Sequence, residues 1–83
     1  MGRVGKLSSI TLNNLIERLA ELNHINWCKF VGGLIQDKLL TESKAIEFEK
    51  RFKKYESLNG DEKVDNRVYA NKVIDILKDF NLV

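Results

Sequence analysis

The chain has 83 residues, of which 43% are hydrophobic and 31% are charged. A chain of this length has room for one small hydrophobic core, and this composition is typical of a folded domain and not of a disordered one. Fourteen Lys and Arg against twelve Asp and Glu leave a net charge of +2, well short of the basic excess of dedicated nucleic-acid binders. We therefore expect one domain over residues 1–83, whose small core gains stability from a partner or a second copy.

The first eight residues are expected to form a flexible basic tail. Arg3 and Lys6 carry its charge, and no acidic residue precedes Glu17. The chain has no apolar run long enough to span a bilayer and no apolar stretch typical of a signal peptide, which predicts no membrane association. Its single cysteine, Cys28, excludes a scaffold held by internal disulfides. These features favour a cytoplasmic location.

The first predicted helix covers residues 11–23, where apolar side chains recur at intervals of three and four. A hydroxyl from Ser8, Ser9 or Thr11 can cap its start by accepting a hydrogen bond from a free amide of the first turn. The apolar positions are Leu12, Leu15, Ile16, Leu19, Ala20 and Leu22.

The second predicted helix covers residues 25–39, after a turn at Asn23–Asn26. It carries the largest side chains of the chain and contains the pair Gly32-Gly33. Each glycine inside a helix costs about 1 kcal/mol relative to alanine, so the pair should weaken, kink or end the helix unless something compensates. We expect the small glycines to let another helix approach closely, with a hinge or a ligand-approach site as the alternatives.

The third and fourth predicted helices cover residues 42–57 and 65–80. Thr41 can cap the third helix, whose apolar seam of Ala45, Phe48, Phe52 and Tyr55 is too short for a coiled coil. Asn59-Gly60-Asp61 is a strong turn signal that should end this helix, and Asp65 can cap the fourth. The chain then ends on the apolar pair Leu82-Val83, which is expected to pack into the core or against a partner. The pattern predicts an all-α fold, a compact bundle of about four helices.

Few side chains in this sequence are suited to catalysis or metal binding. His24 and Cys28 stand four apart, so they would share a face only on a continuous helix, and the predicted turn separates them. A metal site also needs a third and fourth ligand, and a nucleophile needs an oriented base, which this inventory does not supply. We expect Cys28 to be a small buried hydrophobe. The sequence predicts no catalytic residue, no metal, no cofactor and no small-molecule substrate.

The leading hypothesis is a non-catalytic interaction module, an accessory subunit of a larger intracellular assembly that binds a larger protein or forms a homo-oligomer. Most aromatic residues fall on helical stripes and should pack inside, with Tyr55 as the aromatic best suited to an interface. The candidate partner interface is Trp27, Gly32, Gly33, Tyr55, Phe80, Leu82 and Val83.

Two further hypotheses stay open. The basic positions fit contacts with DNA or RNA phosphates, either within such an assembly or in a helix-turn-helix protein that binds DNA directly. These positions are Arg3, Lys6, Lys50, Arg51, Lys53 and Lys54. A small inhibitor or immunity-type protein that blocks a target enzyme would share every feature of the accessory subunit.

Overall fold

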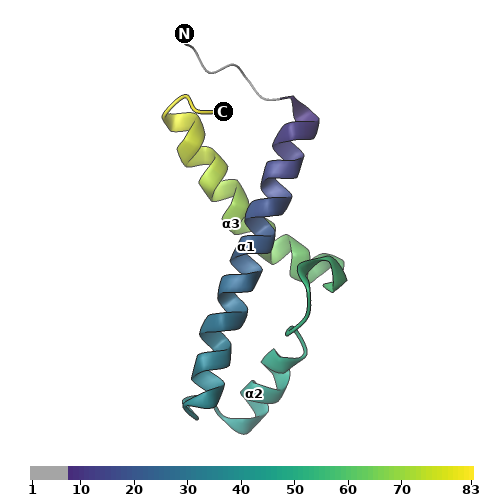
Figure 1. Ribbon diagram of the computed structural model, residues 1–83, viewed down its shortest axis with the longest axis vertical. Helices are drawn as coiled ribbons and strands as arrows, with labels where there is room; N and C mark the ends of the chain where they lie inside the picture. The colour runs from purple at the N-terminus through teal and green to yellow at the C-terminus, as the bar shows by residue number, and fades with distance from the viewer. Residues whose placement is uncertain (1–7) are drawn as a thin grey trace.

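The computed structural model describes residues 8–83, and all the regular elements in this part of the chain are helices, with no strand (Figure 1). It contains α1 (Ser9–Gln36), α2 (Glu42–Glu49), the single 3-10 turn η1 (Tyr55–Ser57) and α3 (Gly60–Asp79). The all-α prediction is confirmed. The prediction of four helices is wrong, because three α-helices are present in these residues. Residues 1–7 of the predicted tail lie outside the described residues, and its last residue, Ser8, is instead the N-cap of α1.

The two long helices cross and diverge on either side of the crossing (Figure 1). Ala20 of α1 and Ala70 of α3 are both 0% exposed, and they belong to one core cluster with Tyr55 and Leu58. Small side chains at a crossing let the two backbones approach closely, and the turn around η1 supplies the larger side chains of the core. The crossing of α1 and α3 is therefore the centre of the fold.

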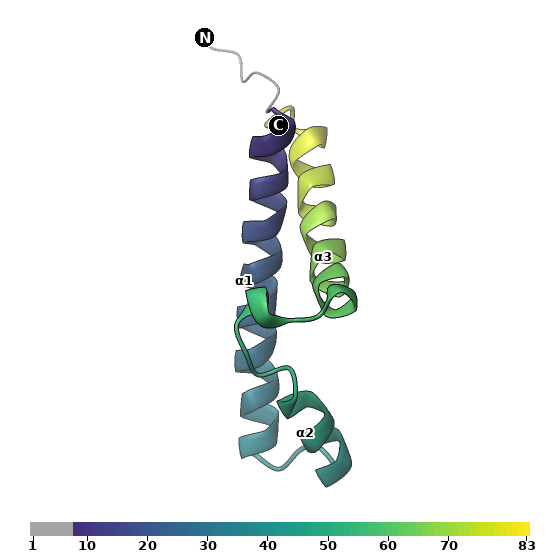
Figure 2. The same cartoon turned by 90° about the vertical axis from the view of Figure 1, so that its right-hand side faces the viewer.

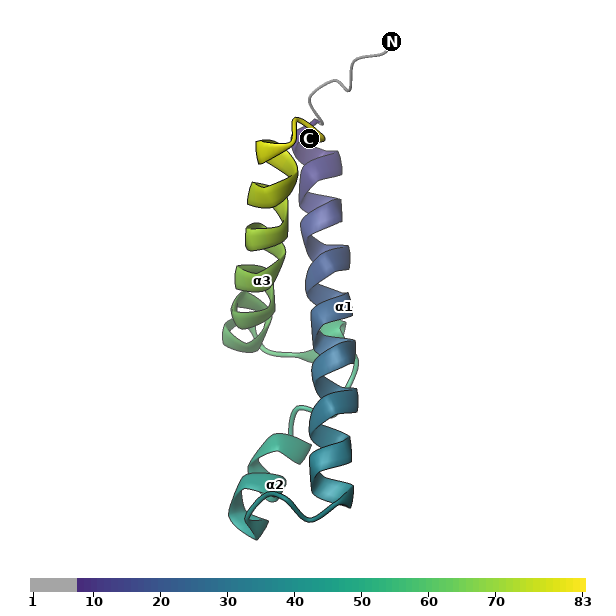
Figure 3. The same cartoon turned by 90° about the vertical axis from the view of Figure 1, so that its left-hand side faces the viewer.

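The molecule is elongated, and the prediction of a compact bundle is wrong. Its principal extents are 54 × 22 × 14 Å and its radius of gyration is 16.1 Å. A compact domain of this length has a radius of gyration of about 12 Å. Figures 2 and 3 show why: α3 lies beside one half of α1, while α2 lies beside the other end of α1. No third long helix fills the space that the divergence of α1 and α3 leaves, within residues 8–83.

Helix α1 runs without interruption through Asn23–Asn26, so the predicted turn between two helices is wrong. Asn and His are weak helix formers, and a cluster of them resembles a helix boundary. Here tertiary bonds compensate for the weak propensity. The Asn23 side-chain amide donates to the Asn66 side-chain oxygen at 2.9 Å, and His24 Nε2 bonds the Lys53 carbonyl oxygen at 2.7 Å.

Helix α2 ends at Glu49, eight residues before the predicted end at Ser57. The chain leaves the helix through a tight turn in which the Lys53 amide bonds the Arg51 carbonyl at 2.9 Å. This turn brings the Lys53 carbonyl to His24 and places η1 against the core. Tyr55, expected on the same helix face as Phe48, is therefore carried on a separate element.

Helix α3 begins at Gly60, five residues before the predicted start. Asn59, expected to form a turn, is the N-cap: its side-chain oxygen accepts from the Glu62 amide at 2.8 Å, and the Glu62 carboxylate accepts from the Asn59 amide at 3.1 Å. This reciprocal arrangement is a capping box, which satisfies two free amides at once. Asp65, the predicted cap, lies one turn inside the helix.

Both long helices end in the same way, with a left-handed residue just beyond the cap. Lys38 and Asn81 each have φ of 58°, and they follow the caps Asp37 and Phe80. The next amide, that of Leu39 or Leu82, reaches back to a carbonyl five residues earlier at 2.9 and 2.8 Å. These are Schellman motifs, and the first ends α1 three residues before the predicted end at Leu39.

Candidate functional site

A network of three side chains ties α1, η1 and α3 together beside the crossing. Arg67 donates two hydrogen bonds to the Glu17 carboxylate, from Nε at 2.6 Å and from a terminal nitrogen at 2.9 Å. The Tyr55 hydroxyl donates to the same carboxylate at 3.0 Å. Arg67 and then the Tyr55 hydroxyl hold the pKa of Glu17 below its ordinary value, against the opposing effect of burial. Burial and the bond to Glu17 raise the pKa of Tyr55. The three groups satisfy one another and serve the fold.

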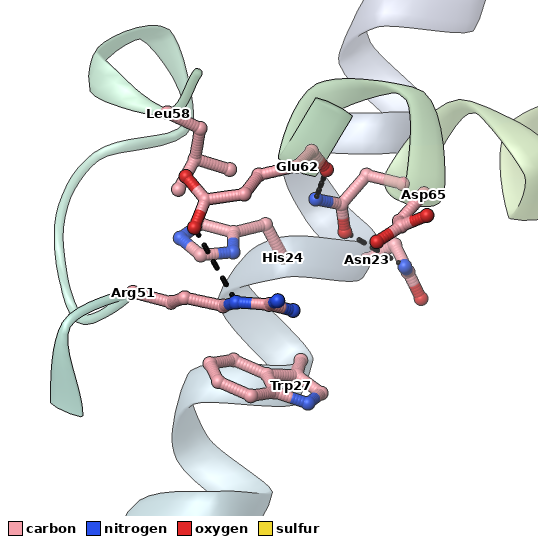
Figure 4. A pocket seen from close by; sticks show the side chains of 8 residues that line it. Asn23, His24, Trp27, Arg51, Leu58, Glu62 and Asp65 are labelled. Carbon is pink, nitrogen blue, oxygen red and sulfur yellow. Dashed lines mark hydrogen bonds and ion pairs between the residues drawn. The ribbon is translucent and has the colours of Figure 1, made fainter. Parts of the chain in front are cut away.

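A polar pocket of about 130 Å³ lies below the crossing, where α1, α3 and the turn after α2 meet (Figure 4). Arg51 Nε lies 3.3 Å from the Glu62 carboxylate, and in Figure 4 the guanidinium sits between that carboxylate and the ring of Trp27. The Asn66 side-chain amide donates to the Glu62 carbonyl at 3.0 Å. The lining residues are Asn23, His24, Trp27, Arg51, Leu58, Glu62, Asp65 and Asn66.

Asn23, Asn66, His24, Arg51 and Glu62 of this pocket each pair with another protein group. Asn66 is buried and uses both ends of its amide, and no buried side-chain polar atom within residues 8–83 lacks a hydrogen-bond partner. A catalytic or ligand site normally keeps some polar groups free to turn toward a substrate. The pocket therefore acts as a polar joint that fixes the turn after α2 against both long helices.

His24 and Cys28 share one face of the continuous α1, contrary to the prediction. His24 is buried, and its Nε2 lies 3.5 Å from Cys28 Sγ. The same Nε2 lies 2.7 Å from the Lys53 carbonyl, which can only accept, so Nε2 carries the proton and has no lone pair to offer the thiol. Burial also raises the pKa of the Cys28 thiol, which disfavours the reactive thiolate. The geometry describes a structural histidine beside an unactivated, half-buried cysteine.

The basic positions divide into three groups. Arg3 and Lys6 lie outside the described residues. Arg51 is committed to Glu62, whereas Lys50, Lys53 and Lys54 are exposed. A broad pocket of about 600 Å³ has Lys29, Lys53 and Lys54 among its lining side chains, together with the carboxylates Glu21 and Glu56. Ile25, Cys28 and Phe52 give this pocket an apolar component.

The residues expected at a partner interface do not come together. Trp27 is half-buried, with Phe48 and Phe52 packed edge-on at 5.6 and 5.9 Å between ring centroids. Tyr55 is 7% exposed, so its hydroxyl serves Glu17. Gly33 and most of the C-terminal group are open: Gly33, Phe80 and Leu82 are exposed and Val83 is half-buried.

Gly32 and Gly33 both lie inside α1, three to four residues before its end. A Cβ placed on either glycine would meet nothing within 4 Å. The prediction that another helix approaches closely at this pair is therefore wrong for the part of the chain that the structure describes.

Sequence reasoning missed how much apolar surface stays open. Within residues 8–83, six hydrophobic residues are buried, two of them alanines, and thirteen large ones are exposed. The short length of the chain was the available signal, because two crossed helices cannot cover both apolar faces. The exposed set is Ile10, Leu22, Ile25, Phe30, Leu39, Ile46, Phe52, Val64, Val68, Tyr69, Ile76, Phe80 and Leu82.

Comparison with known proteins found no match for the chain among family models, curated proteins or solved structures. Within residues 8–83, no group of three or more His, Cys, Asp and Glu side chains is arranged to hold a metal ion. None of the helices in the same residues is long and apolar enough to cross a membrane.

Proposed function

We propose that this chain is a non-catalytic protein–protein interaction module, an accessory subunit of a larger intracellular assembly. The observation that carries the proposal is the exposed apolar surface. Phe30, Ile76 and Phe80 are 67%, 56% and 70% exposed, on a scaffold whose buried core is small. Large apolar side chains exposed in such number favour surfaces that a partner covers. The single free cysteine is consistent with a reducing compartment.

The test is site-specific photocrosslinking from the full chain in its native host. A photoreactive phenylalanine is placed at Phe30 or Phe80, and a matched control is placed at Lys72, an exposed position on α3. We expect one protein to be captured in stoichiometric amount from the two aromatic positions and not from Lys72. A chain that yields no stoichiometric partner and behaves as a stable monomer would overturn the proposal.

An inhibitor or immunity-type protein remains a variant of this proposal, because it too needs an exposed apolar surface that a partner protein covers. The two variants differ in what happens to the partner. If the captured partner is an enzyme, an inhibitor abolishes its activity at a molar ratio near one, whereas an accessory subunit preserves or raises that activity.

A second candidate function, contact with DNA or RNA, has one observation in its favour: Lys29, Lys53 and Lys54 line the same pocket. Two carboxylates also line it, which weakens the local potential. A direct nucleic-acid binder loses affinity steeply as salt rises, by a power law in salt concentration that counts the phosphates contacted. Titration of a duplex between low and physiological salt therefore separates the candidates, because a pure protein adaptor binds at neither concentration.

A further inference from the structure

The broad pocket of about 600 Å³ lies between α1 and the chain that leads from α2 to η1 and through it. Within residues 8–83, all of its lining residues belong to these two stretches. Its apolar side chains include Ile25 and Phe52, which are 43% and 39% exposed. Its volume is within the range of about 300 to 1,000 Å³ that is typical of ligand pockets. We call it the lateral pocket.

The two walls of the lateral pocket run in opposite directions. The Lys53 carbonyl oxygen lies 2.7 Å from His24 Nε2 on α1. Two residues later, the Tyr55 hydroxyl donates to Glu17, which lies seven residues before His24 on α1. Figure 1 shows the same course, because the chain that leaves α2 runs back along α1 to η1 near the crossing. Later residues of the second wall therefore lie beside earlier residues of α1.

Charge is sorted along the lateral pocket. On α1, Glu21 lies nearer the crossing, and Lys29 lies eight residues on, about 12 Å farther toward α2. On the second wall, Lys53 precedes Glu56, so the carboxylate again lies nearer the crossing. Within residues 8–83, neither lysine nor Glu56 forms an ion pair, and the ion pair of Glu21 with Arg18 is 3.9 Å long. The lateral pocket thus has an acidic end, an apolar middle and a basic end.

We infer that the lateral pocket binds a peptide segment of the partner protein in which an apolar side chain lies between a cationic and an anionic residue. This inference rests on the proposed function and names the chemistry that the partner presents. The Lys or Arg of the segment pairs with Glu21 and Glu56. Its apolar side chain contacts Ile25 and Phe52, and its Asp or Glu pairs with Lys29. An extended chain rises about 3.3 Å per residue, so charges about four positions apart match the separation of the two ends.

The order of the charges disfavours other occupants. Lys29, Lys53 and Lys54 attract a polyanion such as DNA or RNA, but the two carboxylates at the acidic end repel its phosphates. A purely apolar ligand leaves both charged ends of the pocket without a partner. A segment that carries both signs in this order complements the pocket over its full length.

Selection from a displayed library of random peptides against the full chain tests the inference. Peptides of about twelve residues are long enough to cross the pocket in the extended form. We expect the enriched peptides to place an apolar residue between a Lys or Arg and an Asp or Glu, with the two charges about four positions apart. The most enriched peptide is then synthesised and titrated against the chain and its variants.

The apolar middle of the pocket is tested with Ile25→Ser. This change removes part of the apolar contact and should weaken binding of the synthetic peptide about tenfold. The matched control is Ile10→Ser, which alters an isoleucine of α1 that is 76% exposed and does not line the lateral pocket. The control should bind the peptide as the parent does.

The basic end of the pocket is tested with Lys29→Glu and Lys53→Glu together. This variant should bind the synthetic peptide at least about tenfold more weakly, and a repeated selection on it should no longer enrich the acidic residue. The matched control, Lys72→Glu with Lys78→Glu, makes the same change of net charge at exposed positions of α3 and should leave the affinity unchanged. Circular dichroism checks that every variant stays helical.

Three results would overturn the inference directly: no enriched peptide, enrichment without the two charges in this order, or equal affinity of the Lys29/Lys53 variant and its control. Enrichment of acidic residues alone would assign the pocket to a polyanion and would also overturn it. Self-association of the chain that Ile25→Ser abolishes, measured by sedimentation equilibrium, would assign the pocket to a second copy, with the same consequence.

Failure of this inference is distinguishable from failure of the proposed function. The photocrosslinking experiment reads a protein captured through Phe30 and Phe80, neither of which lines the lateral pocket. Capture there without peptide selection would overturn the inference and leave the accessory-subunit proposal standing.

Discussion

The crossing of α1 and α3 and the end of the molecule around α2 are held together by different means. At the crossing, two fully buried alanines are flanked by a bidentate ion pair and a tyrosine hydrogen bond. Helix α2 has no buried residue and is held to α1 by edge contacts of Phe48 and Phe52 with Trp27. The difference predicts that the free energy of unfolding depends mainly on the crossing of α1 and α3. The surfaces farther along the helices would then be free to bind without loss of stability.

The strongest test of this comparison is to enlarge one alanine in each region. Ala20→Leu forces three additional carbon atoms into a site with no exposed surface and should lower the free energy of unfolding by about 3 kcal/mol. Ala45→Leu in α2, where the alanine is half-exposed, should change the free energy of unfolding by less than about 0.5 kcal/mol. Urea denaturation measures both variants. Equal effects at the two positions would show that stability is not concentrated at the crossing.

Removing an aromatic ring should release α2 while leaving the crossing intact. Phe48→Ala deletes the edge contact with Trp27 and should lower the free energy of unfolding by about 2 kcal/mol at most, because Phe48 is only half-buried. Native-state hydrogen exchange should show faster exchange in Glu42–Glu49 and unchanged slow exchange around Ala20 and Ala70. Uniform acceleration along the chain would instead mean that both regions unfold as one unit.

The ion pair at the crossing should give stability a dependence on pH. Because the folded pKa of Glu17 is lowered, its contribution is present above the unfolded pKa and is lost as pH falls through the folded value. The side chains of Glu17 and Arg67 are 42% and 38% exposed, so solvent screening limits the effect to about 1 kcal/mol. Glu17→Gln should be less stable than the parent at pH 7, and the gap should close on acidification below about pH 4. A gap that persists at pH 2 would assign the loss to packing.

The smallest effects are expected where α1 ends, and they should be stabilising. Gly33→Ala removes a weak helix former at a position with open space, and Lys38→Gly relieves a left-handed conformation that favours glycine. Each should raise the free energy of unfolding by about 0.5 to 1 kcal/mol. Thermal unfolding of the two single variants and of the double variant measures whether the gains add. A loss of stability in Gly33→Ala would indicate that the space beside this glycine is filled.

The sequence was sufficient to predict the helical class and most of the apolar stripes. It placed a false break inside α1, where the deciding interactions are tertiary, and it misplaced the ends of α1 and α2 and the start of α3. The residues next to Asn23 and His24 in the sequence do not predict that these side chains form hydrogen bonds with Asn66 and with the Lys53 carbonyl. The start of α3 is predictable from the sequence, because Asn59 followed by Glu62 at the third position is a capping-box pattern. The same Asn59 is also a turn signal, and the prediction of a turn was wrong.

The candidate interface was harder to predict than the fold. Helical periodicity reports that a side chain lies on an apolar stripe, and it does not report whether the chain supplies another element to cover that stripe. Phe30 and Val31 are neighbours in sequence, yet Phe30 is 67% exposed and Val31 is 3% exposed. Only the placement of α3 and η1 decides which of the two is hidden.

Because Ala20 and Ala70 lie in one core cluster, the orientation of α1 relative to α3 is set near these alanines. From Ala20 to Gln36 the helix extends about 24 Å beyond the crossing, so a rotation of about 5° at the alanines displaces its far end by about 2 Å. Residues buried in the middle of the molecule thus set the distance between the far ends of α1 and α3, and a substitution at the crossing changes that distance without changing any exposed side chain.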